Sequence, residues 1–257
     1  MPGPSVKVRN LTVHYEGIPV LWDINLEIPQ GVFLGVIGPN GAGKSTFIKT
    51  IVGLINPVSG SITLFGKRRE RVKRRIAYVP QREAIDWDFP ITAQELVLMG
   101  CYPKLGLFQK VTKKERQAAK EALKKVGLQD FADRQIGQLS GGQQQRLFLA
   151  RALLQDADIY FLDEPLSGVD HASGEIIIDI LRDMQRQGKT IFMVHHDLNN
   201  VESYFDWVLF LNTRLVAVGP TAEVFVPKYL QEAYGRDLML YDQVVKISTK
   251  RMSGITS

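Results

Sequence analysis

The sequence predicts an α/β fold with a mostly parallel sheet, N-terminal antiparallel strands and a helical subdomain insertion. Short runs of apolar, β-branched residues alternate with helical patterns, and several helical patterns gather in the middle of the chain. The chain has 257 residues, 45% of them hydrophobic, which is enough to bury a proper core. We expect one domain over residues 1–230, with the insertion at about residues 83–156, and a C-terminal tail over residues 231–257.

The strands are predicted from runs of apolar residues. Residues 32–37 are apolar throughout, as a strand buried on both faces should be. The remaining runs cover residues 6–15, 21–28, 76–79, 159–162, 190–194, 207–211 and 215–218. Helices are expected between these runs, which favours parallel pairing in the core.

The helices are predicted from capping residues and from spacing. Residues 112–126 open with a capping box, Thr112 with Glu115, and stop at Gly127. Further helices are expected over residues 45–54, 91–100 and 141–155.

Composition narrows the classes of protein that this chain can be. The single cysteine, Cys101, excludes an intramolecular disulfide, and no apolar run approaches the ~20 residues of a membrane helix. The net charge of +5 suits a nucleic acid, a membrane surface or an anionic ligand and does not choose among them. The basic run at residues 67–75 is either a solvated turn and strand edge, which we favour, or a contact for nucleic acid or lipid.

A glycine-rich loop follows the apolar strand and opens a helix. Residues 38–45 read Gly-Pro-Asn-Gly-Ala-Gly-Lys-Ser and match the phosphate-loop pattern, which predicts a P-loop NTPase core. Glycines let the backbone wrap closely round phosphate, Lys44 neutralises the outer phosphates, and the Ser45 hydroxyl can ligate Mg²⁺. The expected nucleotide-binding residues of this segment are Gly38, Asn40, Gly41, Ala42, Gly43, Lys44, Ser45 and Thr46.

A second apolar strand, residues 159–162, ends in two acids. Ligands bind at the carboxyl ends of strands in open α/β sheets. Asp163 is therefore placed to hold Mg²⁺ through water, and Glu164 is placed to polarise the attacking water.

The segment between these two motifs is the most informative. Residues 139–143 read Leu-Ser-Gly-Gly-Gln, in which Ser140 and Gln143 form a capping box. A well-capped helix alone would explain that pattern. The pentapeptide nevertheless resembles the signature motif of the ABC ATPases, and the resemblance covers about residues 6–226.

The resemblance implies a homodimer of ATPase subunits that pair head to tail, with ATP and Mg²⁺ as cofactors. Each ATP then lies between one subunit's phosphate loop and the other's signature, so that the residues acting in trans are Ser140, Gly141, Gly142 and Gln143. Asp170 belongs to the loop that crosses to the other subunit, although that loop reads Ser-Gly-Val-Asp instead of the commoner Ser-Ala-Leu-Asp.

Other positions match the family one by one. Tyr15 resembles the aromatic residue that stacks on adenine, Gln81 the glutamine that senses Mg²⁺ and contacts the membrane partner, and His196 the switch histidine at the γ-phosphate. His195 is expected to be structural. The resemblance thus implies a catalytic set of Lys44, Gln81, Glu164 and His196. It implies a Mg²⁺ set of Ser45, Gln81 and Asp163.

A narrower resemblance concerns transport. Residues 79–90 and 194–198 look like the ATPases of manganese, zinc and iron importers that use an extracytoplasmic metal-binding protein. This implies an ATP-hydrolysing subunit at the cytoplasmic face of the cell membrane, bound to a separate permease and not to nucleic acid, with manganese the first expectation. The alternatives are an ABC exporter, an importer of another substrate, or a non-transport ABC protein that clamps DNA or ribosomes.

Residues 82–108 carry more apolar side chains than a small helical insertion is expected to bury. Because such a surplus often marks a protein interface, this segment is expected to bind the permease. Its apolar members are Ile85, Trp87, Phe89, Leu96, Leu98, Met99, Tyr102, Leu105, Leu107 and Phe108. Packing of all of them inside the subdomain is the alternative.

Overall fold

The computed structural model describes residues 3–105 and 110–235, which form two compact units. Unit 1 contains residues 3–71 and 192–235, and unit 2 contains the described residues between them. Strand β8 (Thr190–Val194) runs through the division between the units. Each unit is built around buried strands.

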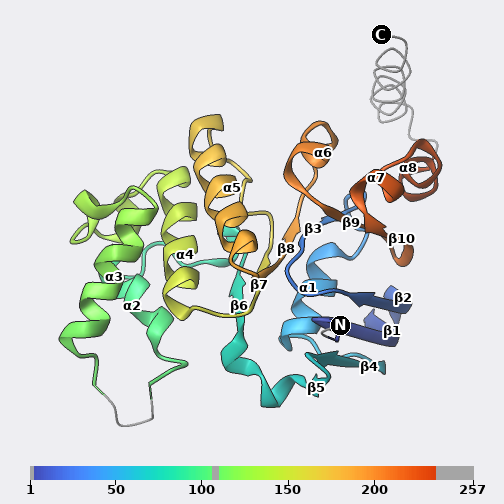
Figure 1. Cartoon of the computed structure of the whole chain (residues 1–257), viewed down its shortest axis with the longest axis horizontal. Coiled ribbons are helices and arrows are strands. Elements are labelled where there is room, and N and C mark those ends of the chain that lie inside the picture. The colour runs from blue at the N-terminus through green and yellow to red at the C-terminus, as the bar shows by residue number, and fades with distance from the viewer. Residues whose placement is uncertain (1–2, 106–109, 236–257) are drawn as a thin grey trace. The chain divides into compact units, whose positions relative to one another are not determined.

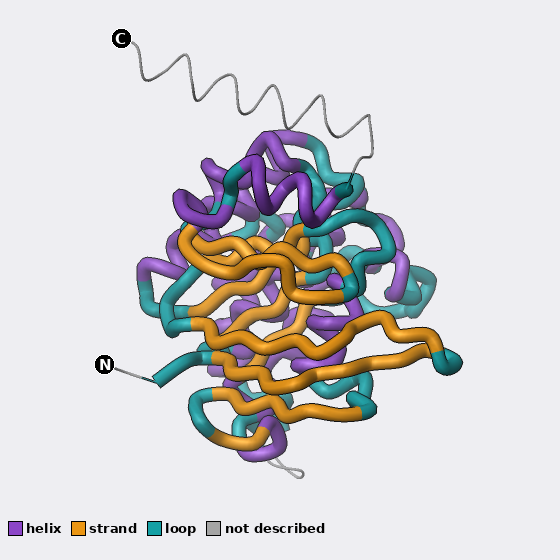
Figure 2. The backbone as a smooth tube through the Cα atoms, turned by 90° about the vertical axis from the view of Figure 1, so that its right-hand side faces the viewer, coloured by secondary structure: helices purple, strands orange, loops and turns teal. Residues whose placement is uncertain are grey.

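Unit 1 begins with a four-stranded sheet in the order β2-β1-β4-β5, seen in Figure 1 and among the orange strands of Figure 2. Its strands are β1 (Val6–Tyr15), β2 (Ile18–Ile28), β4 (Ser59–Leu64) and β5 (Lys67–Arg68). β1 pairs antiparallel with both β2 and β4, which confirms the expected antiparallel strands. Burial along β1 alternates, so that one face of the sheet packs on the core.

The remaining strands of unit 1 hold the phosphate loop. β3 (Phe33–Ile37) is buried along its whole length, as expected, and pairs parallel with β9 (Trp207–Asn212), which pairs antiparallel with β10 (Arg214–Pro220). The helices of unit 1 are α1 (Lys44–Val52), α6 (Val201–Tyr204), α7 (Thr221–Val224) and α8 (Pro227–Tyr234). The last of these crosses the expected boundary between the domain and the tail at residue 231, and residues 236–257 of the tail are outside the described part of the chain.

Unit 2 combines two parallel strands with four helices. β6 (Ile76–Val79) pairs parallel with β7 (Ile159–Leu162). The expected insertion lies in this unit, where three helices are side by side in Figure 1: α2 (Ala93–Leu98), α3 (Lys113–Lys125) and α4 (Gly141–Gln155). The capping box at the start of α3 is present as expected, while α5 (His171–Arg186) was not predicted.

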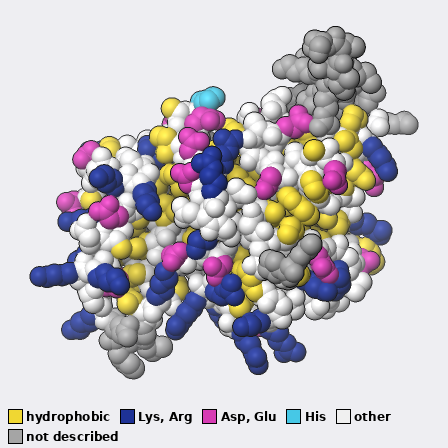
Figure 3. Space-filling view, in the orientation of Figure 1, with side chains coloured by type: hydrophobic (Ala, Val, Ile, Leu, Met, Phe, Trp, Pro, Cys, Tyr) yellow, Lys and Arg dark blue, Asp and Glu magenta, His cyan; other side chains and the backbone are white. Residues whose placement is uncertain are grey.

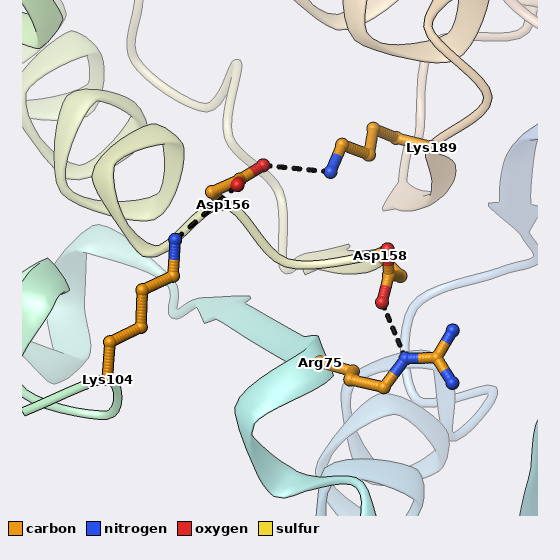
Figure 4. A network of polar contacts seen from close by, with 5 residues as sticks. All are labelled: Arg75, Lys104, Asp156, Asp158 and Lys189. Carbon is orange, nitrogen blue, oxygen red and sulfur yellow. Dashed lines mark hydrogen bonds and ion pairs between the residues drawn. The ribbon is translucent and has the colours of Figure 1, made fainter.

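Two groups of ion pairs fix the segment that leads into β7 (Figure 4). Asp156, which ends α4 in a left-handed conformation, accepts from Lys189 at 2.9 Å and from Lys104 at 3.4 Å. The hydrogen bond from Lys189, together with both ammonium charges, lowers the pKa of Asp156. Asp158 accepts from Arg75 at 2.5 Å. These ion pairs connect the segment before β7 to Lys104, Lys189 and Arg75.

The basic run is partly engaged in the structure. Arg69 donates to the backbone oxygen of Thr50 near the end of α1 at 3.1 Å. Lys67 and Arg68 are exposed on β5, and Lys and Arg side chains gather there at the lower edge of Figure 3. These contacts agree with a solvated turn and strand edge.

Candidate functional site

The phosphate loop joins β3 to α1 through two glycines with positive φ, Gly41 at +79° and Gly43 at +92°. An L side chain is strained in that region. At Gly43 a Cβ would also lie 2.7 Å from the Leu21 side chain and 2.8 Å from the Val20 carbonyl oxygen. The backbone conformation and the crowding both require glycine here, so the loop keeps a backbone path that can wrap closely round a phosphate.

Lys44 lies inside this loop. Its side chain is buried, and Nζ donates to the backbone oxygens of Gly38 at 2.8 Å and Pro39 at 2.9 Å. Helix α1 begins at Lys44 with Gly43 as its N-cap, which has no side chain to accept from the first N–H groups. An uncapped helix start beside a buried ammonium suits an anion.

Tyr15, Ser45 and Thr46 also lie in unit 1. Tyr15 ends β1 with 47% of its surface exposed, so its ring face is accessible for stacking. Ser45 and Thr46 occupy the first turn of α1. Their positions match the expectation, and their roles stay predictions.

The two histidines after β8 differ in environment. His196 is exposed, whereas His195 is buried against Tyr204 and Phe205, with ring centroids 5.7 Å and 5.5 Å away. Burial, aided by the charge of His196, lowers the pKa of His195 to about 4. His195 is therefore neutral near pH 7 and packs as a core residue, which leaves His196 as the side chain that can reach a ligand.

In unit 2 the two acids follow β7 directly. Asp163 is fully buried, and its N–H donates to the Val79 carbonyl at the end of β6 at 2.9 Å. Burial and the nearby Asp163 carboxylate raise the pKa of Tyr78, which keeps that hydroxyl protonated beside the acid. Glu164 is half-buried with φ at +53°. A non-glycine residue in this conformation is strained, and such strain occurs often at functional sites.

The oxygen ligands available to Mg²⁺ are few. The fully buried carboxylate of Asp163 requires hydrogen bonds or a cation to offset its lost hydration. Among the described residues, no three His, Cys, Asp or Glu side chains gather as a metal site. Ser45 lies in unit 1, whereas Gln81 and Asp163 lie in unit 2. A hydroxyl, an amide oxygen and a carboxylate are oxygen donors of the kind that Mg²⁺ prefers, and this set stays a prediction.

The signature segment caps helix α4 as the sequence predicted. The Ser140 hydroxyl accepts from the Gln143 N–H at 3.3 Å, and the Ser140 N–H donates to Gln143 Oε1 at 2.9 Å. Gly142 is buried, and a Cβ there would lie 3.0 Å from Ser173 Oγ and 3.1 Å from Asp170 Oδ2. The signature helix and the loop before α5 thus pack directly on one another within unit 2.

Asp170 has a local structural role of its own. It is the N-cap of α5 and accepts from the Ser173 N–H at 2.9 Å. That hydrogen bond lowers the pKa of Asp170, so its carboxylate stays charged at the helix start. The exposed carboxylate fits the expected place of this residue on the surface, and its contact with a second subunit stays a prediction.

The loop that follows Gln81 makes one contact that the sequence did not predict. The Arg82 guanidinium donates from Nε to Oε1 of Gln144 on α4 at 2.8 Å. The two residues are 62 positions apart, and no local pattern predicts their pairing. This hydrogen bond links the Gln81 loop to the helix that begins with the signature.

The residues of the expected permease surface differ in how far they are buried. Leu96 and Leu98 are buried within unit 2, whereas Phe89 and Tyr102 are 52% and 54% exposed. Trp87 is half-buried and packs edge to face on Phe148, with ring centroids 5.5 Å apart. Met99 also is exposed. Leu107 and Phe108 lie outside the described residues.

None of the helices in the described ranges has the length and the apolar character needed to cross a bilayer.

This chain is similar to known proteins along the region that carries most of these motifs. The family model described as ABC transporter matches residues 21–167. The manganese transport system ATP-binding protein of Bacillus subtilis is 53% identical over 93% of this chain and 96% of its own length. The zinc transport system ATP-binding protein of Treponema pallidum is 52% identical over 90% of this chain and 87% of its own length.

Solved structures agree with the fold. A metal-chelate type ABC transporter in an inward-facing conformation matches with a TM-score of 0.79 and 28% identity, over 90% of this chain and 88% of that one. The dimeric structure of a bacterial ABC transporter cassette matches with a TM-score of 0.75 and 30% identity, over 84% of this chain and 98% of that one.

Proposed function

This chain belongs to the ABC transporter family, and we propose that it is the ATP-binding and hydrolysing subunit that powers an importer for a divalent transition metal. Manganese is the first candidate, and zinc or iron is next. The observation that carries this proposal is the 53% identity along 93% of the chain to a manganese transport system ATP-binding protein. An identity of that length includes surfaces outside the shared ATPase motifs, where transporters of different cargo differ.

In the proposed mechanism the phosphate loop and the start of α1 bind the ATP phosphates. Lys44 leaves the carbonyls of Gly38 and Pro39, which it now contacts, for the stronger acceptors of the β- and γ-phosphates. Tyr15 stacks on the adenine with its exposed ring. Two left-handed glycines permit the path of the loop, and the Thr213 N–H, which donates to the Ala42 carbonyl at 3.0 Å, supports it before ATP binds.

Hydrolysis is assigned to Glu164 after β7 and His196 after β8, together with the residues that hold Mg²⁺. Ser45, Gln81 and Asp163 hold Mg²⁺, which supplies positive charge to the phosphates when it is bound. Glu164 accepts the proton of the attacking water. His196 contacts the γ-phosphate and helps to place that water, while the buried neutral His195 supports the backbone beside it.

Assembly completes the site in this proposal. Two copies pair so that Ser140, Gly142 and Gln143 of one subunit face the ATP of the other, and the start of α4 offers N–H groups to the γ-phosphate. Asp170 contacts the second subunit. The pair acts at the cytoplasmic face of the membrane on a permease that receives metal from an extracytoplasmic binding protein.

Uptake of radioactive manganese in cells that lack this chain tests the proposal. We expect uptake to be lost in those cells and to return with the wild-type chain. Glu223→Gln, a change on an exposed residue of α7, should also restore uptake, whereas Glu164→Gln should not. Competition with unlabelled manganese, zinc and iron then ranks the metals. Wild-type uptake of all three metals in the deleted strain would contradict metal import by this subunit.

A further inference from the structure

A loop of unit 2, residues 82–87, closes on itself and packs on helix α4. The Trp87 indole N–H donates from Nε1 to the Arg82 carbonyl at 3.0 Å, which joins the two ends of this 82–87 loop. The half-buried Trp87 ring packs edge to face on Phe148 of α4, with ring centroids 5.5 Å apart. Because the indole has both a hydrogen-bond acceptor for its N–H and a ring contact for its apolar part, its orientation is fixed.

The signature segment, residues 140–143, lies between two contacts of the 82–87 loop. After the signature, Arg82 donates from Nε to Gln144 Oε1 at 2.8 Å. Before the signature, a Cβ on Gly137 would lie 2.7 Å from the Trp87 carbonyl oxygen, so only glycine permits this approach of the two backbones. The chain is therefore held on both sides of the signature by one loop.

Gln144 connects the two sides. Its Oε1 accepts from Arg82, and its Nε2 donates to the Ile136 carbonyl at 3.2 Å. Gln144 and Ile136 are both buried, and the Ile136 N–H donates to the Ile91 carbonyl at 3.1 Å. A buried amide whose polar atoms are both hydrogen-bonded keeps one orientation, which fixes the path of residues 136–144.

The start of α4 also lies near the same arginine. A Cβ on Gly141, the first residue of the helix, would lie 3.7 Å from Arg82 Cζ and 3.4 Å from the Gly168 carbonyl oxygen. There is room for a methyl group and little more at this point. The position of the signature is thus determined by its neighbours in unit 2 as well as by its own capping box.

We propose that Trp87 is a positioning residue for the signature, because its indole N–H closes the loop that fixes residues 140–143 before a second subunit binds. The inference rests on the proposed function in one respect, that the signature of one subunit faces the ATP of the other. Hydrogen-bond donors stabilise a developing charge best when they are already in place, since no reorganisation is then needed. Trp87 therefore acts inside unit 2, although it belongs to the expected permease surface.

Trp87→Phe tests this role in the full-length subunit because it removes the indole N–H and keeps an aromatic ring on Phe148. Trp207→Phe is the matched control, since it makes the same change on a half-buried tryptophan of unit 1. We expect Trp87→Phe to lower kcat about 5- to 10-fold, the effect of one lost hydrogen bond. Its Kd for ATP should stay within about twofold, because the phosphate loop and Tyr15 lie in unit 1. Trp207→Phe should match the wild type in both quantities.

Gly137→Ala tests the contact on the other side of the signature. The new Cβ would lie 2.7 Å from the Trp87 carbonyl oxygen, so the loop and the signature must separate. We expect a lower kcat and an unchanged Kd for ATP, as in Trp87→Phe. Gly174→Ala in α5 is the control, because the nearest atom to a Cβ there is 3.9 Å away.

A mixture of subunits separates positioning of the signature from a loss of stability. When Trp87→Phe subunits are mixed with an excess of Lys44→Ala subunits, each mixed pair has one composite site with an intact phosphate loop and an intact signature. A mixture of wild-type and Lys44→Ala subunits forms the same site and is the reference. We expect equal turnover in the two mixtures, because the altered signature of Trp87→Phe then faces only the inactive phosphate loop.

The outcomes distinguish the inference from the proposed function. A deficit of Trp87→Phe that persisted in the mixture would place the effect in the subunit's own site and overturn the inference. An unchanged kcat in Trp87→Phe, with or without a lower Tm, would overturn it whatever the mixture showed. A wild-type chain that bound no ATP, or that formed no pair with ATP, would instead overturn the proposed function.

Discussion

Arg82 and Gln144 form a hydrogen bond of 2.8 Å between the loop after Gln81 and the helix that begins with the signature. Gln144 is buried and also donates from Nε2 to the Ile136 carbonyl at 3.2 Å. Both polar atoms of the Gln144 side-chain amide are therefore hydrogen-bonded. Within unit 2, this hydrogen bond connects the loop directly to α4.

A double-mutant cycle measures this contact. Arg82→Met and Gln144→Met each keep an unbranched side chain and remove the polar partner. We expect a coupling free energy of unfolding of about 1.5 kcal/mol, the lower end for a hydrogen bond to a charged group, because the contact is only partly buried. Urea unfolding of the two single variants and the double variant gives the value. Additivity within about 0.3 kcal/mol would mean that the two residues do not support each other.

Glu164→Gln should leave ATP binding intact and reduce hydrolysis at least ~10²-fold, because the amide keeps the shape of the side chain and loses the basicity of a general base. ATP binding and steady-state phosphate release in the same preparation measure the two effects. The ATP-bound dimer should persist and be visible by size-exclusion chromatography. Glu223→Gln on exposed α7 is the control and should hydrolyse ATP like the wild type. Near-normal turnover by Glu164→Gln would exclude Glu164 as the base.

Tyr15→Ala should weaken the binding of ATP by roughly 1 kcal/mol, the scale of an aromatic stacking contact. Tyr15→Phe should restore most of the affinity, because the exposed ring face makes the contact and the hydroxyl does not. Titration with a fluorescent ATP analogue measures both variants. Equal losses in the two variants would indicate a role for the hydroxyl instead.

Gly142→Asp should block hydrolysis while each subunit still binds ATP. The new carboxylate meets the γ-phosphate of the partner's ATP across a partly dry interface, where like charges repel strongly. The position is also crowded within unit 2, because a Cβ on residue 142 would lie 3.1 Å from Asp170 Oδ2. Circular dichroism and thermal unfolding of the variant therefore accompany the ATPase measurement.

A mixture of variants tests whether sites are shared between subunits. Gly142→Asp subunits combined with Lys44→Ala subunits should form pairs with one intact composite site and one doubly altered site. We expect partial ATPase activity from two parents that are each inactive. Full activity of Gly142→Asp as a purified monomer would contradict a site built from two subunits.

The parts that the sequence predicted well are those determined by neighbouring residues. The phosphate loop is set by its own glycines, and the Ser140–Gln143 capping box needs only a spacing of three residues. Helix α5 was not predicted because its apolar residues 176–178 are three successive isoleucines, whose β-branched side chains favour strands. Asp170 nevertheless starts the helix by capping it, and packing of its apolar face holds it.

The contacts that support the site were not predictable in the same way. The Asn212 side chain donates to the Ala233 carbonyl only because α8 folds back onto β9, and no residue type near Asn212 predicts that partner. In the sequence only the family resemblance separated His195 from His196, because the two side chains are identical and adjacent, whereas in the structure their burial distinguishes them. Such relationships come from tertiary structure, whereas the motifs come from local chemistry.

Tyr102→Glu and Phe89→Glu test the surface that we expect to bind the permease. Both side chains are more than half exposed, so charge there should spare the fold and basal ATP hydrolysis of the isolated subunit. A carboxylate in an apolar interface costs several kcal/mol, and permease binding and metal uptake should fall at least ~10-fold. Co-purification with the permease and uptake in complemented cells measure this. Leu54→Glu is the control, because it places the same charge on another exposed apolar residue, in unit 1. It shows whether a charge on any exposed apolar residue lowers uptake. Normal uptake in both variants, or a collapse of basal hydrolysis, would exclude this surface as the coupling site.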